Sequence, residues 1–248
     1  MSIEELCEKF NLKDYTINDD GSIDVDNHVF LGTYDLSAEI GYLDELPLNF
    51  NKVTGDFYCN EHVLTTLKGC PKWVGGSFYC NDNKLTSLEY SPVYVGESFH
   101  CGGNRLIDLK FSPESVGDDF NCIGNILTSL EGSPYKVGDS FYCNDNKLTD
   151  LKGCPEEVGG SFWFTNNEIY DLKEFPKSVG GKIGLKNNPI GSIFQFGGID
   201  IDIIKAFNTF KVLKDGVVNL KRLKYVIYEL FDQFIYLHLV SEYYKIKK

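Results

Sequence analysis

The feature that most constrains this chain is a 21-residue repeat, which runs through about two thirds of the sequence. A phenylalanine opens each repeat, and the sequence numbers of the first two, Phe57 and Phe78, differ by 78 − 57 = 21. A fixed order of residue types follows it: Cys, Asn, two Leu, and then Pro, Val and Gly. The opening residues are Phe57, Phe78, Phe99, Phe120, Phe141, Phe162 and Ile183. Self-similarity at this period indicates a solenoid, in which each repeat packs on its neighbours.

Five of the eight cysteines occupy one column of the repeat: Cys59, Cys80, Cys101, Cys122 and Cys143. Phe164 and Leu185 fill the same position in the next two repeats. A position that accepts Cys, Phe or Leu requires apolar bulk, and free Cys packs as a small hydrophobic residue. We therefore expect buried, reduced thiols, with no disulfide framework, no metal site and no cofactor.

The run Phe-x-Cys-x-x-Asn-x-Leu-x-x-Leu resembles the leucine-rich repeat, with Phe and Cys in its strand positions. The resemblance covers residues 36–194 and implies a parallel β-sheet on a concave face. In this chain Pro-Val-Gly replaces the helix that some leucine-rich repeats have on the convex side, so the resemblance also implies a mostly irregular convex side. The continuation Thr-Ser-Leu-Glu-Gly-x-Pro-x-x-Val-Gly is similar to short repeats in uncharacterised proteins of large tailed bacteriophages, which implies a viral protein that acts in the host cytoplasm.

The two ends of the chain lack the repeat and are expected to be caps. Residues 1–35 predict a helix over Ser2–Phe10, with capping-box spacing of Ser2 and Glu5, and then a β-hairpin around Asp20-Gly21. Residues 36–194 form the solenoid, with a degenerate first repeat beginning near Leu36. Residues 195–248 predict a helix over Asp202–Leu213 and a second, longer helix from Asn219, which together make a helical cap.

Charge and hydropathy restrict the partners. The net charge of −12 is uneven: residues 1–200 carry 15 Lys/Arg and 31 Asp/Glu, while residues 201–248 carry nine and five. An acidic solenoid repels nucleic acid and anionic membrane, so direct binding to either is not expected. No apolar run approaches the ~18 residues of a membrane-spanning helix, and the acidic N-terminus does not resemble a signal peptide. We therefore expect an intracellular protein.

The residue between Phe and Cys in each repeat should point away from the core, since side chains alternate along a strand. These residues are Tyr58, Tyr79, His100, Asn121, Tyr142 and Trp163, and the acidic residues Asp82, Asp119 and Asp145 lie near them in the repeat. Aromatic rows with a polar border are typical of protein-recognition surfaces. The alternative is that aromatic columns only stabilise the sheet by stacking between strands.

From these residues we expect a non-enzymatic protein-binding module that captures, and inhibits or redirects, a host or defence protein. Two alternatives stay open: a carbohydrate- or surface-binding structural module, and an acidic mimic of nucleic acid. Ser98, His100 and Asp119 should be neighbours, as in a hydrolase. However, the serine belongs to a repeated column and no oxyanion hole accompanies it, so catalysis is not expected.

Overall fold

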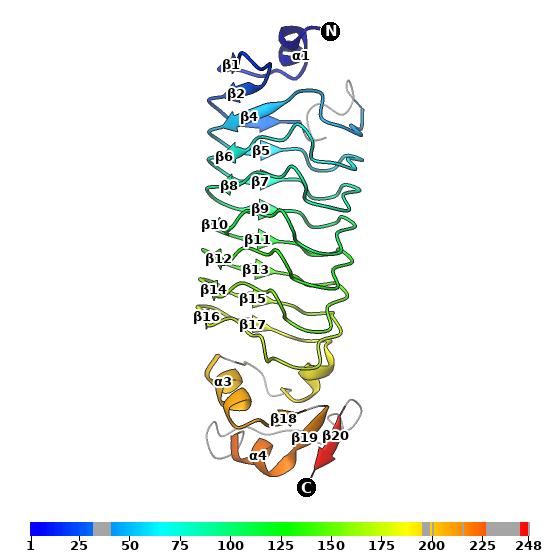
Figure 1. Ribbon diagram of the computed structural model, residues 1–248, viewed down its shortest axis with the longest axis vertical. Coiled ribbons are helices and arrows are strands. Elements are labelled where there is room, and N and C mark those ends of the chain that lie inside the picture. Colours follow the sequence, from blue (N-terminus) through cyan, green and yellow to red (C-terminus); the bar gives the residue numbers. More distant parts are fainter. Residues whose placement is uncertain (32–40, 195–198, 200, 215, 227–243, 248) are drawn as a thin grey trace.

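The computed structural model is a long stack of turns, with the N-terminus at one end and the C-terminus at the other (Figure 1). It describes residues 1–31, 41–194, 199, 201–214, 216–226 and 244–247. Each repeat makes one turn of the stack, so the predicted solenoid is confirmed.

One parallel sheet of eight strands, called sheet B here, contains the Phe-x-Cys segments. Neighbouring repeats pair residue for residue, as Phe78 with Phe57 and Tyr79 with Tyr58. Its strands are β3 (Val29–Phe30), β5 (Phe57–Tyr58), β7 (Phe78–Tyr79), β9 (Phe99–His100), β11 (Phe120–Asn121), β13 (Phe141–Tyr142), β15 (Phe162–Trp163) and β17 (Ile183–Gly184).

A second sheet, sheet A, runs along the stack where an irregular convex side was expected. Its nine strands are β1 (Tyr15–Ile17), β2 (Ile23–Val25), β4 (Phe50–Val53), β6 (Trp73–Val74), β8 (Tyr94–Val95), β10 (Ser115–Val116), β12 (Lys136–Val137), β14 (Glu157–Val158) and β16 (Ser178–Val179). In β6, β8, β10, β12 and β14 the repeated Val is buried and anchors the strand, as Val74 and Val95 do at 0% and 2% exposure. The Pro three residues before each Val keeps the chain extended, so it can pair with the next turn.

Along its described turns the stack runs straight in the view of Figure 1. Each turn adds one strand to sheet A and one to sheet B. Both sheets therefore rise by the same spacing of ~4.8 Å per turn. The surface predicted to be concave is the outer face of sheet B.

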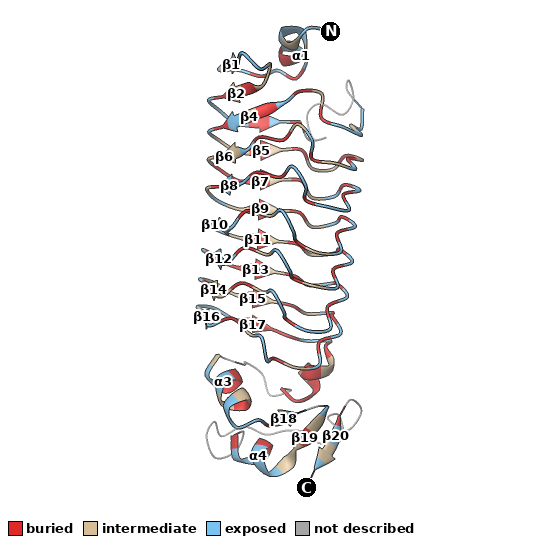
Figure 2. Cartoon of the chain, in the orientation of Figure 1, coloured by how far each residue is buried: buried red, intermediate tan, exposed pale blue. Residues whose placement is uncertain are grey.

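The core consists of the repeated Phe, Cys, Leu and Val columns between the two sheets (Figure 2). The phenylalanines from Phe57 to Phe162 are fully buried and form a continuous column with ring centroids 5.2–5.8 Å apart. The five repeat cysteines are free and fully buried, as predicted. Burial raises the pKa of the Cys101, Cys122 and Cys143 thiols, which keeps them protonated.

The repeated Asn links consecutive turns through its side-chain amide. In the central turns, the Asn104 Oδ1 accepts a hydrogen bond from the Leu85 N–H at 3.0 Å, and its Nδ2 donates to the carbonyl oxygens of Cys80 and Cys101. The same pattern recurs at Asn83, Asn125, Asn146, Asn167 and Asn188. His62 takes this place in the first repeat, where its Nδ1 accepts from the Leu43 N–H. The Asn column thus hydrogen-bonds backbone groups of two consecutive turns.

At the N-terminal end, helix α1 (Ile3–Lys9) has the predicted capping box between Ser2 and Glu5. Strands β1 and β2 form the predicted antiparallel hairpin, and β2 also pairs in parallel with β4. The sheet B strand before Phe57 is β3, where Val29 pairs with Phe57 across an interval longer than one repeat. The turns thus begin before the expected start near Leu36, which lies outside the described residues.

At the C-terminal end, a 3-10 helix η1 (Pro189–Ser192) is followed by helix α3 (Ile201–Thr209), close to the predicted first helix. A three-stranded sheet that was not predicted follows, made of β18 (Leu213–Lys214), β19 (Val217–Asn219) and β20 (Lys245–Lys247). Helix α4 (Leu220–Lys224) begins where the second helix was predicted, and the rest of that prediction, from residue 227, lies outside the described residues. No helix among the described residues is long and apolar enough to cross a membrane.

Candidate functional site

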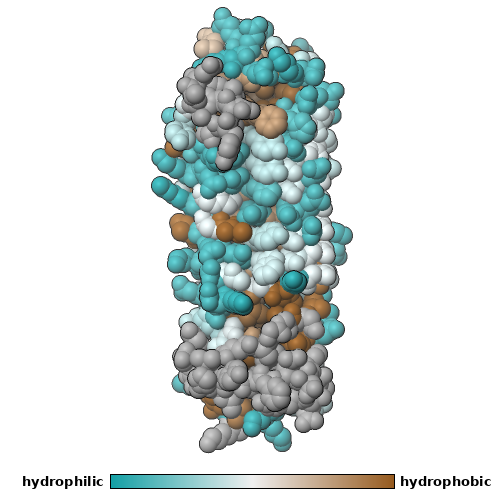
Figure 3. Space-filling view, turned by 180° about the vertical axis from the view of Figure 1, so that it is seen from behind, coloured by the Kyte–Doolittle hydropathy of each residue, from teal (hydrophilic) through white to brown (hydrophobic). Residues whose placement is uncertain are grey.

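The predicted partner-binding row occupies the outer face of sheet B. Each of its residues is the second residue of a sheet B strand and pairs in register with the same position in the next turn. We call the set Phe30, Tyr58, Tyr79, His100, Asn121, Tyr142 and Trp163 the outer row. From Tyr58 to Trp163 all its members are half-buried. One side of the molecule, with a pale row of intermediate hydropathy between hydrophilic teal residues, is shown in Figure 3.

The first part of the outer row is a continuous stack of four rings. Phe30 stacks on Tyr58 with centroids 4.7 Å apart, Tyr58 on Tyr79 at 4.5 Å, and Tyr79 on His100 at 4.6 Å. The planes differ by 3–12°. Both faces of Tyr58 and of Tyr79 are therefore covered by neighbouring rings, so these two present their edges to solvent, whereas Phe30 and His100 end the stack and each have one stacked neighbour.

The stack ends at Asn121, where an open depression of about 330 Å³ lies in the face. It is lined by Tyr79, Asn81, Asp82, His100, Gly102, Gly103, Asn121 and Ile123. Most other repeats carry Asn, Glu, Asp or Thr where Gly102, Gly103 and Gly124 stand. The depression thus exists because the glycines provide no side chains there. A Cβ on Gly103 would lie 2.3 Å from the Asp82 Oδ1, so the Asp82 carboxylate lies close against this glycine.

Beyond the depression, Tyr142 and Trp163 are backbone partners on neighbouring strands. Among the ring contacts of the described residues, no stacking joins the Tyr142 ring to the Trp163 ring. The indole of Trp163 instead lies over Gly184, because a Cβ on that glycine would meet the ring Cε3 at 2.0 Å. Gly184 therefore makes room for Trp163 at the end of the row.

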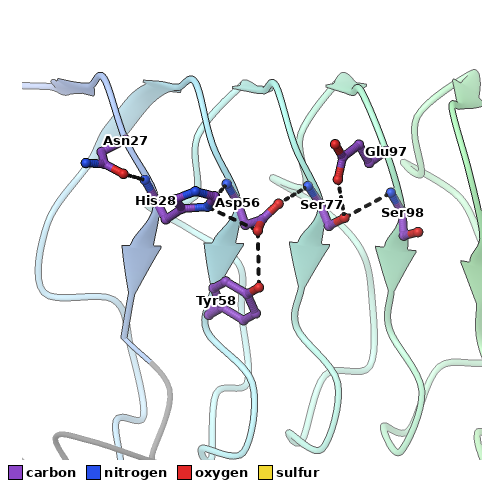
Figure 4. Close-up of polar contacts among 7 residues, drawn as sticks. All are labelled: Asn27, His28, Asp56, Tyr58, Ser77, Glu97 and Ser98. Carbon is purple, nitrogen blue, oxygen red and sulfur yellow. Dashed lines mark hydrogen bonds and ion pairs between the residues drawn. The ribbon is translucent and has the colours of Figure 1, made fainter.

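Asp119 belongs to a polar ladder beside the outer row, which begins at His28 and Asp56 (Figure 4). In this ladder the side chain of one turn accepts a hydrogen bond from the backbone N–H one turn later. The Asp56 Oδ1 accepts from Ser77 at 2.7 Å, the Ser77 Oγ from Ser98 at 3.2 Å, and the Ser98 Oγ from Asp119 at 3.2 Å. It continues through Asp119, Ser140 and Ser161 to Lys182. The ladder satisfies backbone donors that the strands leave unpaired.

Asp82 and Asp145 occupy the turn that follows the strand, at positions with left-handed backbone. Their φ angles are 55° and 56°, and Glu61, Gly103, Gly124, Asn166 and Asn187 share this conformation in the other repeats. Gly, Asn and Asp adopt the left-handed region most readily. The backbone thus explains the residue type at both positions, while Asp82 also lines the depression.

His100 is neutral near neutral pH. Burial lowers the pKa of its imidazole and outweighs the opposing effect of the Asp119 carboxylate. The Ser98 Oγ accepts from the Asp119 backbone, and no hydrogen bond in the described chain joins Ser98, His100 and Asp119 as a catalytic triad would require.

Two exposed isoleucines lie on the turns next to the depression. Ile107 and Ile126 are 54% and 47% exposed, whereas most of the other residues in their two repeat columns are polar or charged. A small brown, hydrophobic group is visible halfway along the stack in Figure 3. The middle of the stack therefore departs from the repeat both in shape and in polarity. Within the described residues, no group of three or more His, Cys, Asp or Glu side chains is arranged to hold a metal ion.

Two aromatic features escaped the sequence interpretation. Phe30 extends the outer row, but its interval to Tyr58 is longer than one repeat, which takes it out of the period. On sheet A, Trp73 and Tyr94 stack with centroids 5.2 Å apart, and the Lys52 Nζ lies 4.9 Å from the Trp73 ring centroid. Trp73 and Tyr94 are one repeat apart, and each stands just before a buried Val. This spacing is the sequence signal that would have predicted the aromatic pair on sheet A.

These features define a β-solenoid in which each repeat forms one turn and adds a strand to each of two sheets. No protein-family model matches the chain, and none of the curated proteins compared with it is a significant match.

Proposed function

We propose that the protein is a non-enzymatic binding module that recognises a protein partner through the outer row of sheet B. The observation that carries the proposal is the interruption of the row: four stacked rings end at a depression, and Tyr142 and Trp163 follow it. Large aromatic side chains held in register by paired strands lose little conformational entropy when a partner covers them. A row that served the sheet alone would gain nothing from the change to His100, Asn121 and glycines in its middle.

The geometry favours a protein over a carbohydrate at this face. Sugars pack on the open faces of aromatic rings, but both faces of Tyr58 and of Tyr79 are covered by their neighbours in the stack. Ring edges, tyrosine hydroxyls and a shallow depression suit the mixed polar and apolar surface of a folded protein.

Mimicry of nucleic acid is less well supported. Such a mimic needs rows of carboxylates that are free to meet cationic side chains. Beside the outer row, the Asp56 and Asp119 carboxylates accept hydrogen bonds from backbone N–H groups of the next turn. The negative charge of the solenoid is then a factor for solubility and for partner orientation, rather than the recognition feature itself.

The resemblance of the repeats to those of tailed bacteriophages makes a host or defence protein the first partner to test. The experiment is affinity capture from a lysate of the corresponding host cells, with wild type and Tyr142→Ala/Trp163→Ala as matched baits. A protein that wild type retains and the double variant loses supports the proposal. Lys110→Ala/Lys152→Ala is the control, since both lysines are exposed and lie outside the outer row. A partner that both double variants retain equally contradicts it.

A further inference from the structure

A groove of about 830 Å³ lies next to sheet A, away from the outer row and formed by the return segments of several turns. Among its lining residues are Lys68, Lys72, Tyr90, Val93, Phe111 and Glu114. Tyr90, Val93 and Phe111 are 54%, 75% and 62% exposed, so the fold does not bury them. The groove is therefore an apolar and aromatic surface that the solenoid itself leaves open.

Tyr90 and Phe111 also occupy backbone positions that are unfavourable for aromatic residues. Their φ angles are 71° and 72°, and the same position is Gly69, Gly132 and Gly153 in three other repeats and Glu174 in a fourth. The left-handed region costs bulky residues backbone energy that glycine does not pay. Since these rings are exposed, packing within the fold does not compensate for this backbone strain. Strained residues that do not stabilise the fold are typical of ligand-binding sites.

The groove lining also holds two lysines, Lys68 and Lys72, together with two carboxylates, Asp20 and Glu114. Both lysines are exposed. The Asp20 carboxylate accepts hydrogen bonds from the Ser22 backbone and hydroxyl, and the charge of Lys72 contributes to its lowered pKa. Glu114 belongs to the same turn as Phe111. Lys68 and Lys72, on the turn before that of Tyr90, form no ion pair within the described residues and can therefore meet a carboxylate of a partner.

We propose that this groove binds an extended peptide segment of a protein partner, with apolar side chains against Tyr90, Val93 and Phe111 and an acidic side chain at Lys68 and Lys72. The two kinds of contact lie on adjacent turns, within reach of neighbouring residues of one extended chain. This site is separate from the outer row and does not depend on the function proposed there.

The test uses a displayed library of random peptides of about ten residues, which span about 33 Å when extended. Peptides are selected for binding to wild type, and those that also bind Tyr90→Gly/Phe111→Gly are removed. The remaining peptides should share a motif with an acidic residue beside aromatic or aliphatic ones. A synthetic peptide of that motif should bind the double-glycine variant at least about tenfold more weakly than wild type. It should lose affinity at Lys68→Ala/Lys72→Ala as well.

The double-glycine variant separates binding from folding. Because glycine suits both positions, its melting temperature should equal or exceed that of wild type. Tyr135→Ala is the control, because Tyr135 is also exposed and does not line the groove, and peptide affinity should not change. In the peptide experiment, any one of three results would overturn the proposal: no enriched motif, a peptide that binds wild type and the glycine variant equally, or an enriched motif without acidic residues. Dimerisation of the protein alone that the glycine substitutions abolish would also overturn it, in favour of a second copy.

Discussion

The imidazole of His100 stacks on the phenol ring of Tyr79, with centroids 4.6 Å apart and planes 7° apart. It is the last ring of the stack, and the depression lies next to it. The contact also shields the imidazole from water, which is the larger cause of its lowered pKa.

This lowered pKa makes stability depend on pH. Below the ordinary histidine pKa of about 6.5, the unfolded chain takes up a proton at His100 that the folded chain resists. The free energy of unfolding should therefore fall as the pH decreases below 6.5, until the folded-state imidazole also becomes protonated. Urea unfolding of wild type and of His100→Tyr between about pH 5.5 and 7.5 measures how the free energy of unfolding of each protein depends on pH. As the pH decreases over this range, wild type should lose more stability than His100→Tyr. Equal pH dependence in both proteins would show that the imidazole is not desolvated.

The cysteine column should be sensitive to polarity rather than to size alone. Cys101→Ser is expected to lower the free energy of unfolding by about 1–3 kcal/mol, because a hydroxyl in this fully buried position lacks an assured partner. Cys101→Ala should cost less. In native protein the five repeat thiols should react with a thiol reagent only as fast as the protein unfolds. Rapid modification of all five would place the column outside the core.

The asparagine column should matter to folding alone. Asn104→Ala and Asn125→Ala each remove an acceptor for a leucine N–H and donors to carbonyl oxygens of two turns. A buried group left without its partner costs about 1–3 kcal/mol, so both variants should melt at lower temperature. Their affinity for a partner of the outer row, measured well below the melting temperature, should stay at the wild-type value. Weaker binding at unchanged stability would move these residues to the working surface.

The repeat columns could be predicted because each one samples the same environment in every turn. A column that holds both Cys101 and Phe164 must be buried, because the two residues share only their apolar character. An Asn stands at the position of Asn104 in most repeats because each of those turns uses its side-chain amide. Sheet A could not be read as easily. Each of its repeated strands shows one inward Val, such as Val95, beside a residue that varies freely, so the two-residue alternation is too short to identify a strand.

The ends and the sheet A groove were obscured for other reasons. Val29 pairs with Phe57 across an interval longer than one repeat, so counting back by the period does not find it. In the sequence, Tyr90 and Phe111 stand at a position where three other repeats have glycine. A bulky residue in a glycine column indicates a backbone position with positive φ.

The outer row is the central claim, and its energetics can be tested once capture has identified a partner. Tyr79, Tyr142 and Trp163 should be hot spots, each costing about 2 kcal/mol or more of binding energy on truncation to Ala. Their side chains are half-buried on the outer face, so the melting temperatures of these variants should change less than that of Asn104→Ala.

The most direct measurement is a calorimetric titration of that partner into wild type, Trp163→Ala and Lys152→Ala. We predict that Trp163→Ala weakens binding by about thirtyfold, which corresponds to about 2 kcal/mol, while Lys152→Ala binds as wild type does. Equal affinities for Trp163→Ala and Lys152→Ala would contradict recognition through the outer row of sheet B.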